Sequence, residues 1–84
     1  MKMSVLEQII ETYPDDTFLK ADGFDSAIIG VDSESMRLIY SVIKCLDILE
    51  QDMSEDDALE YFLFNVQGAY VGKHTPIWCN DLFD

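Results

Sequence analysis

The segment that follows Met53 constrains the fold most, because it combines a helix start with a long apolar stripe. Ser54 and Asp57 have the spacing of an N-cap and the third helical position, where the serine oxygen accepts a hydrogen bond from a first-turn amide. Apolar residues then recur at the spacing of one helical face, at Leu59, Phe62, Leu63 and Val66. This pattern predicts a helix whose apolar stripe, widened by Tyr61 and Phe64, packs into the core.

A second helix start lies near the N-terminus. Ser4 and Glu7 have the spacing of a capping box, in which each side chain satisfies a backbone amide of the other residue. Apolar residues at helical period follow as far as Tyr13. Pro14 disfavours helical geometry at the residue before it, so we expect this first helix to end there.

The middle of the chain is ambiguous. Residues 27–31 are apolar and β-branched, which predicts a buried strand followed by a polar turn. We expect a hairpin partner through about Tyr40, with Ser41 capping a helix over residues 42–51. A single helix over residues 35–51 is the competing interpretation, because both periods fit the apolar residues.

The rest of the chain completes a small domain. Gly68 or Gly72 is expected to end the helix that begins at Ser54, by adopting a left-handed conformation. Residues 75–79 are typical of an edge strand, with Pro76 near its start. We therefore predict that residues 1–84 form a single α+β domain, a three-stranded sheet with helices packed on one face, in the order helix, hairpin, helix, helix, strand.

The charge balance excludes several classes of partner. Seventeen acidic residues against five basic ones give a formal net charge of −12. This argues against direct binding to nucleic acid or to an anionic membrane, since both need cationic side chains. Glu7 and Glu11 interrupt the N-terminal apolar stretch, so we expect no signal peptide and a cytoplasmic protein in which Cys45 and Cys79 are free thiols.

Several segments carry a resemblance to a known group of proteins. The segments are residues 22–25, 27–31, 37–41, 60–62, 64–66, 68–72 and 75–77. In this pattern, over about residues 20–79, the chain resembles small acidic proteins of unassigned function encoded by tailed bacteriophages. The resemblance implies a bacterial cytoplasm as the working compartment. It implies no activity, and no site residue is carried over from it.

The residue types that carry chemistry do not form a known motif. His74 and Cys79 are the closest pair of soft ligands, but structural zinc needs four ligands in paired short spacings. The acidic residues after Asp52 lack the glycine and the terminal glutamate of a calcium loop. Cys45 has only the single histidine as a conceivable base. We therefore expect no metal, no cofactor and no catalytic residue.

Carboxylates gather around the junction of the second and third predicted helices. The candidate partner-binding residues are Asp47, Glu50, Asp52, Glu55, Asp56 and Glu60, and with Asp57 of the same segment they make up the acidic cluster. One interpretation is an ordinary solvated face. The sharper interpretation is a negative platform that docks on a basic, nucleic-acid-binding surface of another protein. The total charge can match only part of the phosphate charge on a comparable length of duplex, so such mimicry is partial.

We therefore expect a non-enzymatic accessory protein that binds a host protein and inhibits it by occupying a basic surface. The alternative is a self-assembling structural or scaffold protein, such as a homodimer, that uses Phe64, Tyr70 and Trp78 at its interface. A small enzyme is the third hypothesis.

Overall fold

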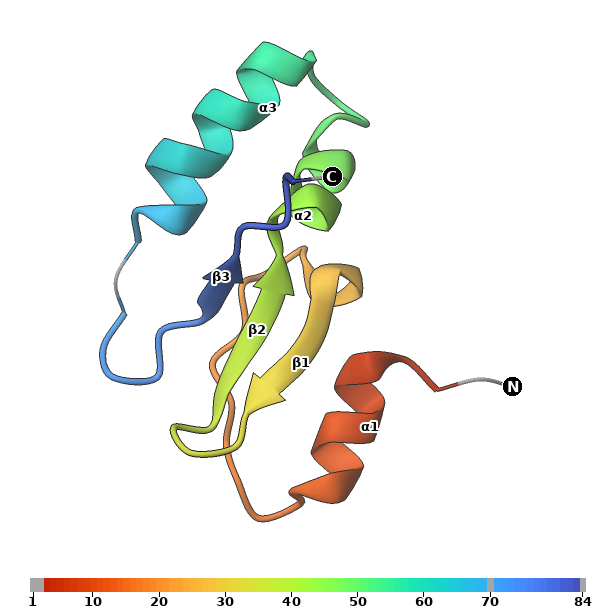
Figure 1. Cartoon of the computed structure of the whole chain (residues 1–84), viewed down its shortest axis with the longest axis vertical. Helices are drawn as coiled ribbons and strands as arrows, with labels where there is room; N and C mark the ends of the chain where they lie inside the picture. The colour runs from red at the N-terminus through yellow and green to blue at the C-terminus, as the bar shows by residue number, and fades with distance from the viewer. Residues whose placement is uncertain (1–2, 70, 84) are drawn as a thin grey trace.

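The computed structural model describes residues 3–69 and 71–83. Its elements follow the predicted order of helix, hairpin, helix, helix and strand (Figure 1). They are α1 (Val5–Thr12), the short 3-10 helix η1 (Asp25–Ala27), β1 (Ile28–Asp32), β2 (Arg37–Ser41), α2 (Val42–Leu49), α3 (Glu55–Tyr61), the π-helical segment η2 (Phe62–Gln67) and β3 (Ile77–Cys79). The predicted α+β class is confirmed.

The sheet is mixed and has the strand order β1-β2-β3. β1 and β2 form an antiparallel hairpin with an irregularity between Ile28 and Gly30. β3 is an edge strand, as the proline before it predicts, and it runs parallel to β2. Tyr40 is paired with Ile28 on one side and with Trp78 on the other, so these three side chains lie on the same face of the sheet.

The hairpin interpretation of residues 36–41 is confirmed, and the single helix over residues 35–51 is wrong. Leu38 and Tyr40 are two residues apart on β2, and both are completely buried. Side chains at i and i+2 share a face in a strand but not in a helix, so this burial fits a strand. Ser41 ends the strand and caps α2, because its Oγ accepts a hydrogen bond from the Lys44 amide at 3.1 Å. α2 is shorter than predicted and ends at Leu49.

One cluster of buried side chains joins the sheet to the helices. Leu6 and Ile9 of α1 and Ala58 of α3 belong to it together with the buried residues of the hairpin. Trp78 lies between two of its members: its ring is 5.0 Å from that of Tyr40 and meets Phe62 edge-on at 5.5 Å, measured between ring centroids. Trp78 therefore couples the sheet to the last helix.

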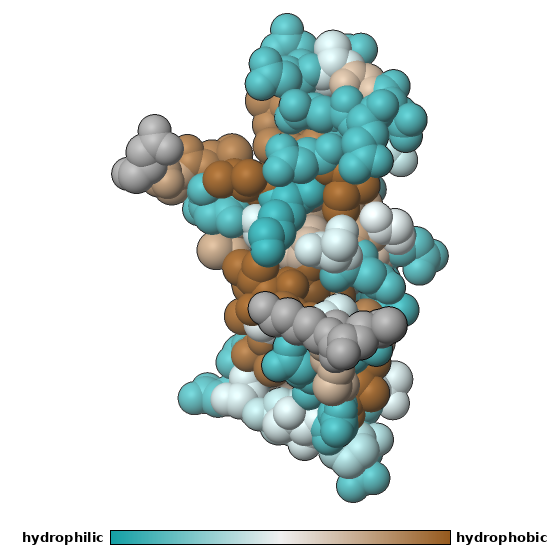
Figure 2. All heavy atoms as spheres, turned by 90° about the vertical axis from the view of Figure 1, so that its right-hand side faces the viewer, coloured by the Kyte–Doolittle hydropathy of each residue, from teal (hydrophilic) through white to brown (hydrophobic). Residues whose placement is uncertain are grey.

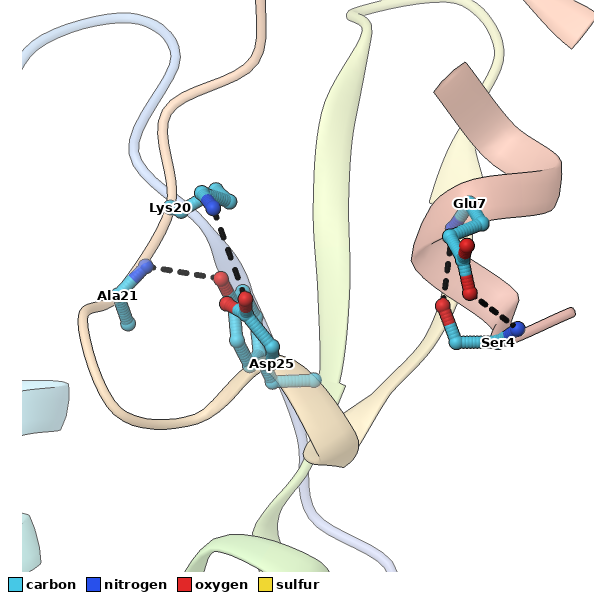
Figure 3. A network of polar contacts seen from close by, with 6 residues as sticks. Ser4, Glu7, Lys20, Ala21 and Asp25 are labelled. Atoms are coloured by element: carbon cyan, nitrogen blue, oxygen red, sulfur yellow. Dashed lines mark hydrogen bonds and ion pairs between the residues drawn. The ribbon is translucent and has the colours of Figure 1, made fainter. Parts of the chain in front are cut away.

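Polar contacts fix the segment between α1 and η1 and the start of α1 (Figure 3). The Tyr40 hydroxyl accepts a hydrogen bond from the Ala21 amide at 2.8 Å, which ties the loop to the buried strand. The predicted capping box at Ser4 and Glu7 is present. α1 ends at Thr12, close to the boundary that Pro14 predicts.

The predicted end of the third helix is wrong in its geometry. The helical segment does end at Gly68, but Gly68 has a φ of −75° and so lies in the right-handed region. Close approach explains a glycine there, because a Cβ atom would lie 3.1 Å from the Leu63 carbonyl oxygen. The left-handed conformation belongs to Gly72, with a φ of +107°, in the turn that precedes β3.

Candidate functional site

The acidic cluster lies at the end of the molecule formed by the α2–α3 junction, at the top of Figure 1. All seven of its side chains are exposed, including the six candidate partner-binding residues. Asp47 is on α2, Glu50 and Asp52 are in the connection, and the others are on α3. Hydrophilic side chains dominate this end of the molecule in the view of Figure 2. The fold therefore brings together the residues that sequence reasoning selected.

Among the described residues, no cation forms an ion pair with these carboxylates. Over residues 3–69 and 71–83, Lys20 with Asp25 is the one ion pair, at 3.5 Å (Figure 3). Arg37 is half-buried, and its Nε donates to the Thr75 carbonyl oxygen at 2.6 Å. Lys44 is exposed on α2. The negative charge of the acidic cluster thus faces solvent without a salt-bridge partner in the part of the chain that the structure describes.

The apolar stripe of the last helix is less buried than predicted. Phe62 is fully buried and Val66 is partly buried, but Leu59, Tyr61 and Leu63 are 42–47% exposed and Phe64 is 77% exposed. The buried line along the helix runs instead through Ala58 and Phe62. A sheet whose third strand has three residues offers only a narrow surface to this helix, so the wider stripe is left exposed in the part of the chain that the structure describes.

Two hollows flank this helix. A half-open cleft of about 250 Å³ separates it from the loop before η1 and from β3; its lining includes Phe24, Val66, Pro76 and Trp78. A shallower hollow of about 430 Å³ lies along the helix itself and is lined by Met53, Asp57, Glu60, Tyr61, Phe64 and Asn65. Tyr61 and Asn65 line both hollows, so the two are adjacent.

The three aromatic residues assigned to a homomeric interface differ in their surroundings. Phe64 is exposed, as that interpretation requires. Trp78 is not spare, because it is packed against the core cluster. Tyr70 lies outside the described residues. Of the three rings, Phe64 is therefore the one that is shown to be largely exposed.

The groups considered for metal or catalytic chemistry are dispersed. Within the described residues, no three His, Cys, Asp or Glu side chains are grouped as a metal site requires. Both cysteines are free. Cys45 is fully buried, and burial raises the pKa of its thiol to about 12, with Asp81 adding to the shift, so the reactive thiolate is disfavoured. The thiol therefore acts as a small apolar group, as its place in the helix predicts.

Comparison with protein-family models, curated proteins and solved structures finds no match to this chain. None of the described helices is long and apolar enough to cross a membrane. The residues of the cleft were not predicted from the sequence, because they come from three segments that only the fold brings together. The hollow had a partial signal in the sequence, since Glu60 was predicted to bind a partner and Phe64 was a candidate interface aromatic. Tyr61 and Phe64 were also assigned to the apolar stripe that packs into the core.

Proposed function

We propose that this chain is a non-enzymatic protein-binding domain whose acidic cluster docks on a basic surface of a partner protein. The observation that carries the proposal is the exposure of all seven carboxylates at one end of the molecule. In the described part of the chain none of them has an ion-pair partner. Uncompensated charge of one sign raises the rate of encounter with a surface of the opposite sign.

The partner class follows from the amount of charge. The longest dimension of the domain is 39 Å, and duplex DNA of that length carries about 23 negative charges. The net charge of −12 is roughly half of that. The domain can therefore occupy part of a nucleic-acid-binding surface and inhibit the protein that carries it. The excess of negative charge makes a nucleic-acid-handling factor our favoured partner. The resemblance to phage proteins implies a bacterial cytoplasm as the compartment.

Self-assembly is the second candidate function, and the exposure of Phe64 favours it. Charge opposes it, since a second copy would bring another net charge of −12 to the contact. Measurement of the sedimentation coefficient at low and high salt separates the two functions. A monomer at both salt concentrations removes self-assembly, whereas a dimer that tightens as salt is added supports it.

The test of the proposed function uses two variants with equal change in charge. The first reverses Glu55, Asp56 and Glu60 to Lys. The control reverses Glu11, Asp15 and Asp16 to Lys. These residues are exposed on α1 and just after it, far from the acidic cluster in the sequence. A partner is captured from bacterial lysate with the parent protein, purified, and its association rate with all three proteins is measured at low and high salt.

We expect the first variant to associate at least about tenfold more slowly than the parent at low salt, and the control to lose much less. The parent's association rate should fall steeply with salt. Equal losses in both variants would mean that only total charge matters. If neither variant is slower, the acidic cluster is not the docking surface.

A further inference from the structure

The cleft and the hollow beside it differ in chemistry. The cleft is lined mainly by apolar and aromatic side chains, among them Phe24, Pro76 and Trp78. The hollow joins the carboxylates of Asp57 and Glu60 to the exposed ring of Phe64. An apolar side chain suits the first environment. A cation suits the second, because it pairs with carboxylates and is also attracted to an aromatic face.

The geometry of the cleft leaves room for a ligand. Its volume of about 250 Å³ is open on one side, and it is walled by a helix, a loop and a strand. Trp78 lines it, and the buried Nε1–H of this residue has no hydrogen-bond acceptor among the described residues. The neighbouring wall contains η2, and π-helical turns within α-helices are frequent at functional sites.

The charged residues that line the two hollows favour a basic occupant. Among the described residues, Lys20 is the single cation that lines either hollow, and it is paired with Asp25 at 3.5 Å. Asp22, Asp57 and Glu60 supply negative charge on the two sides. A second copy of this chain would oppose these carboxylates with its own excess of carboxylates. A basic segment of another protein is complementary to them.

We propose that the cleft and the hollow form one docking groove for a basic peptide segment of the partner. An apolar side chain of that segment enters the cleft beside Trp78, and a neighbouring arginine or lysine lies in the hollow between Asp57, Glu60 and Phe64. The inference rests on the proposed function, since it assumes a basic partner. It adds that a defined apolar anchor, and not charge alone, holds the complex.

The probes are short unlabelled and fluorescein-labelled peptides of arginine and glutamine that carry one leucine at varied distance from the nearest arginine. Matched peptides replace the leucine with glutamine, or every arginine with glutamine. Binding is measured by fluorescence anisotropy at low and high salt. Trp78 is the only tryptophan of the chain, so its emission reports directly on occupation of the cleft by the unlabelled peptides.

The leucine-to-glutamine peptides test the apolar anchor, and two pairs of variants test the aromatic ring and the carboxylates of the hollow. Phe64→Ala is compared with Phe83→Ala, because the two rings are equally exposed, at 77% and 78%. Asp57→Asn with Glu60→Gln is compared with Asp15→Asn and Glu11→Gln, which remove the same number of charges from exposed positions elsewhere. All four variants change only exposed side chains, and thermal melting of each variant verifies that it folds.

We expect at least one leucine peptide to shift the Trp78 emission and to bind about tenfold or more tightly than its glutamine counterpart. Phe64→Ala and the Asp57/Glu60 variant should each weaken it about tenfold, and their controls less than twofold. A further variant reverses Glu55 and Asp56, which do not line the hollow, to Lys. If this variant loses peptide binding, while binding does not depend on the leucine or on Phe64, the groove is overturned and the proposed function is left intact. Leucine-dependent binding that needs no arginine overturns the basic occupant of the groove, and the proposed function is then judged by the association rate of the captured partner alone. Absence of a Trp78 response with every peptide overturns the groove.

Discussion

Single residues in the last third of the chain hold β3 in place, and Thr75 is the most connected of them. Its Oγ1 donates to the Gly72 carbonyl at 2.6 Å and accepts from the Val71 amide at 2.9 Å. Its carbonyl accepts from Arg37 of β2. Sequence reasoning treated Thr75 only as the first residue of a strand. Its role depends on Arg37, which is 38 residues away in the sequence, and such a partner leaves no local signal.

Gly72 shapes the same turn. Its φ of +107° is a conformation that side-chain-bearing residues rarely adopt. We predict that Gly72→Ala lowers the free energy of unfolding by about 1–2 kcal/mol, which is several degrees of melting temperature in a domain of this size. Gly30→Ala is the control, because Gly30 has no positive φ and no atom within 4 Å of an added Cβ. The control should be neutral or slightly stabilising. Thermal melting followed by circular dichroism measures both variants. An equal loss of stability in the two would contradict the role of the positive φ at Gly72.

At the scale of elements, helix starts could be predicted from sequence and helix faces could not. The caps at Ser4, Ser41 and Ser54 are formed within three residues of each serine, so spacing alone reveals them. Which side of α3 is buried depends on the width of the sheet that receives it. The sheet accepts Ala58 and Phe62, and the rest of the apolar stripe, including Phe64, becomes the surface that the candidate site uses.

α2 has a second cap that comes from the end of the described chain. Asp81 accepts hydrogen bonds from the Ser41 hydroxyl and, at 2.9 Å, from the Ile43 amide. The bond from the Ile43 amide, followed by the one from Ser41, lowers the pKa of Asp81 below its usual value. Ionised Asp81 therefore stabilises the folded state above that usual value, and this contribution is lost as the pH falls through the lower, folded pKa.

We predict that Asp81→Ala lowers the free energy of unfolding by about 1 kcal/mol at pH 7, which is typical of the loss of a helix cap. The difference from the parent should narrow below about pH 4, where the parent's carboxylate becomes protonated. Asp15→Ala removes an exposed charge outside any helix or strand and serves as the control. Urea unfolding at a series of pH values gives the comparison. A difference that stays constant down to pH 2 would show that Asp81 does not act through its charge.

At the scale of the whole molecule, composition gives the net charge of −12, but it does not predict which carboxylates line the groove. The fold class, the element order and the exposure of the acidic cluster follow from patterns along the chain. The cleft does not, because its walls come from residues 20–24, 61–69 and 71–78, and no periodicity relates these segments. Trp78 was likewise assigned to a surface, although its pairing with Tyr40 places it against the core.

The excess of carboxylates should also affect stability. Within the described residues one ion pair offsets a small part of it, so mutual repulsion opposes the compact state. We predict that the melting temperature rises by several degrees between about 10 mM and 0.5 M NaCl, as the screening length falls from about 30 Å to a few Å. Differential scanning calorimetry at neutral pH measures this. A flat or falling melting temperature would indicate that the carboxylates are compensated in the fold.

The parallel pairing of β3 with β2 has a kinetic consequence. The hairpin joins neighbours in the sequence, whereas Arg37 with Thr75 and Ser41 with Asp81 join residues 38 and 40 apart. Closing so long a loop costs conformational entropy before the new contacts compensate for it. We therefore expect the hairpin and α2 to form early, and the docking of β3 to come late and to limit the rate of folding. Until that step the cleft lacks its strand wall, so we expect the proposed anchor site to form only when folding is complete.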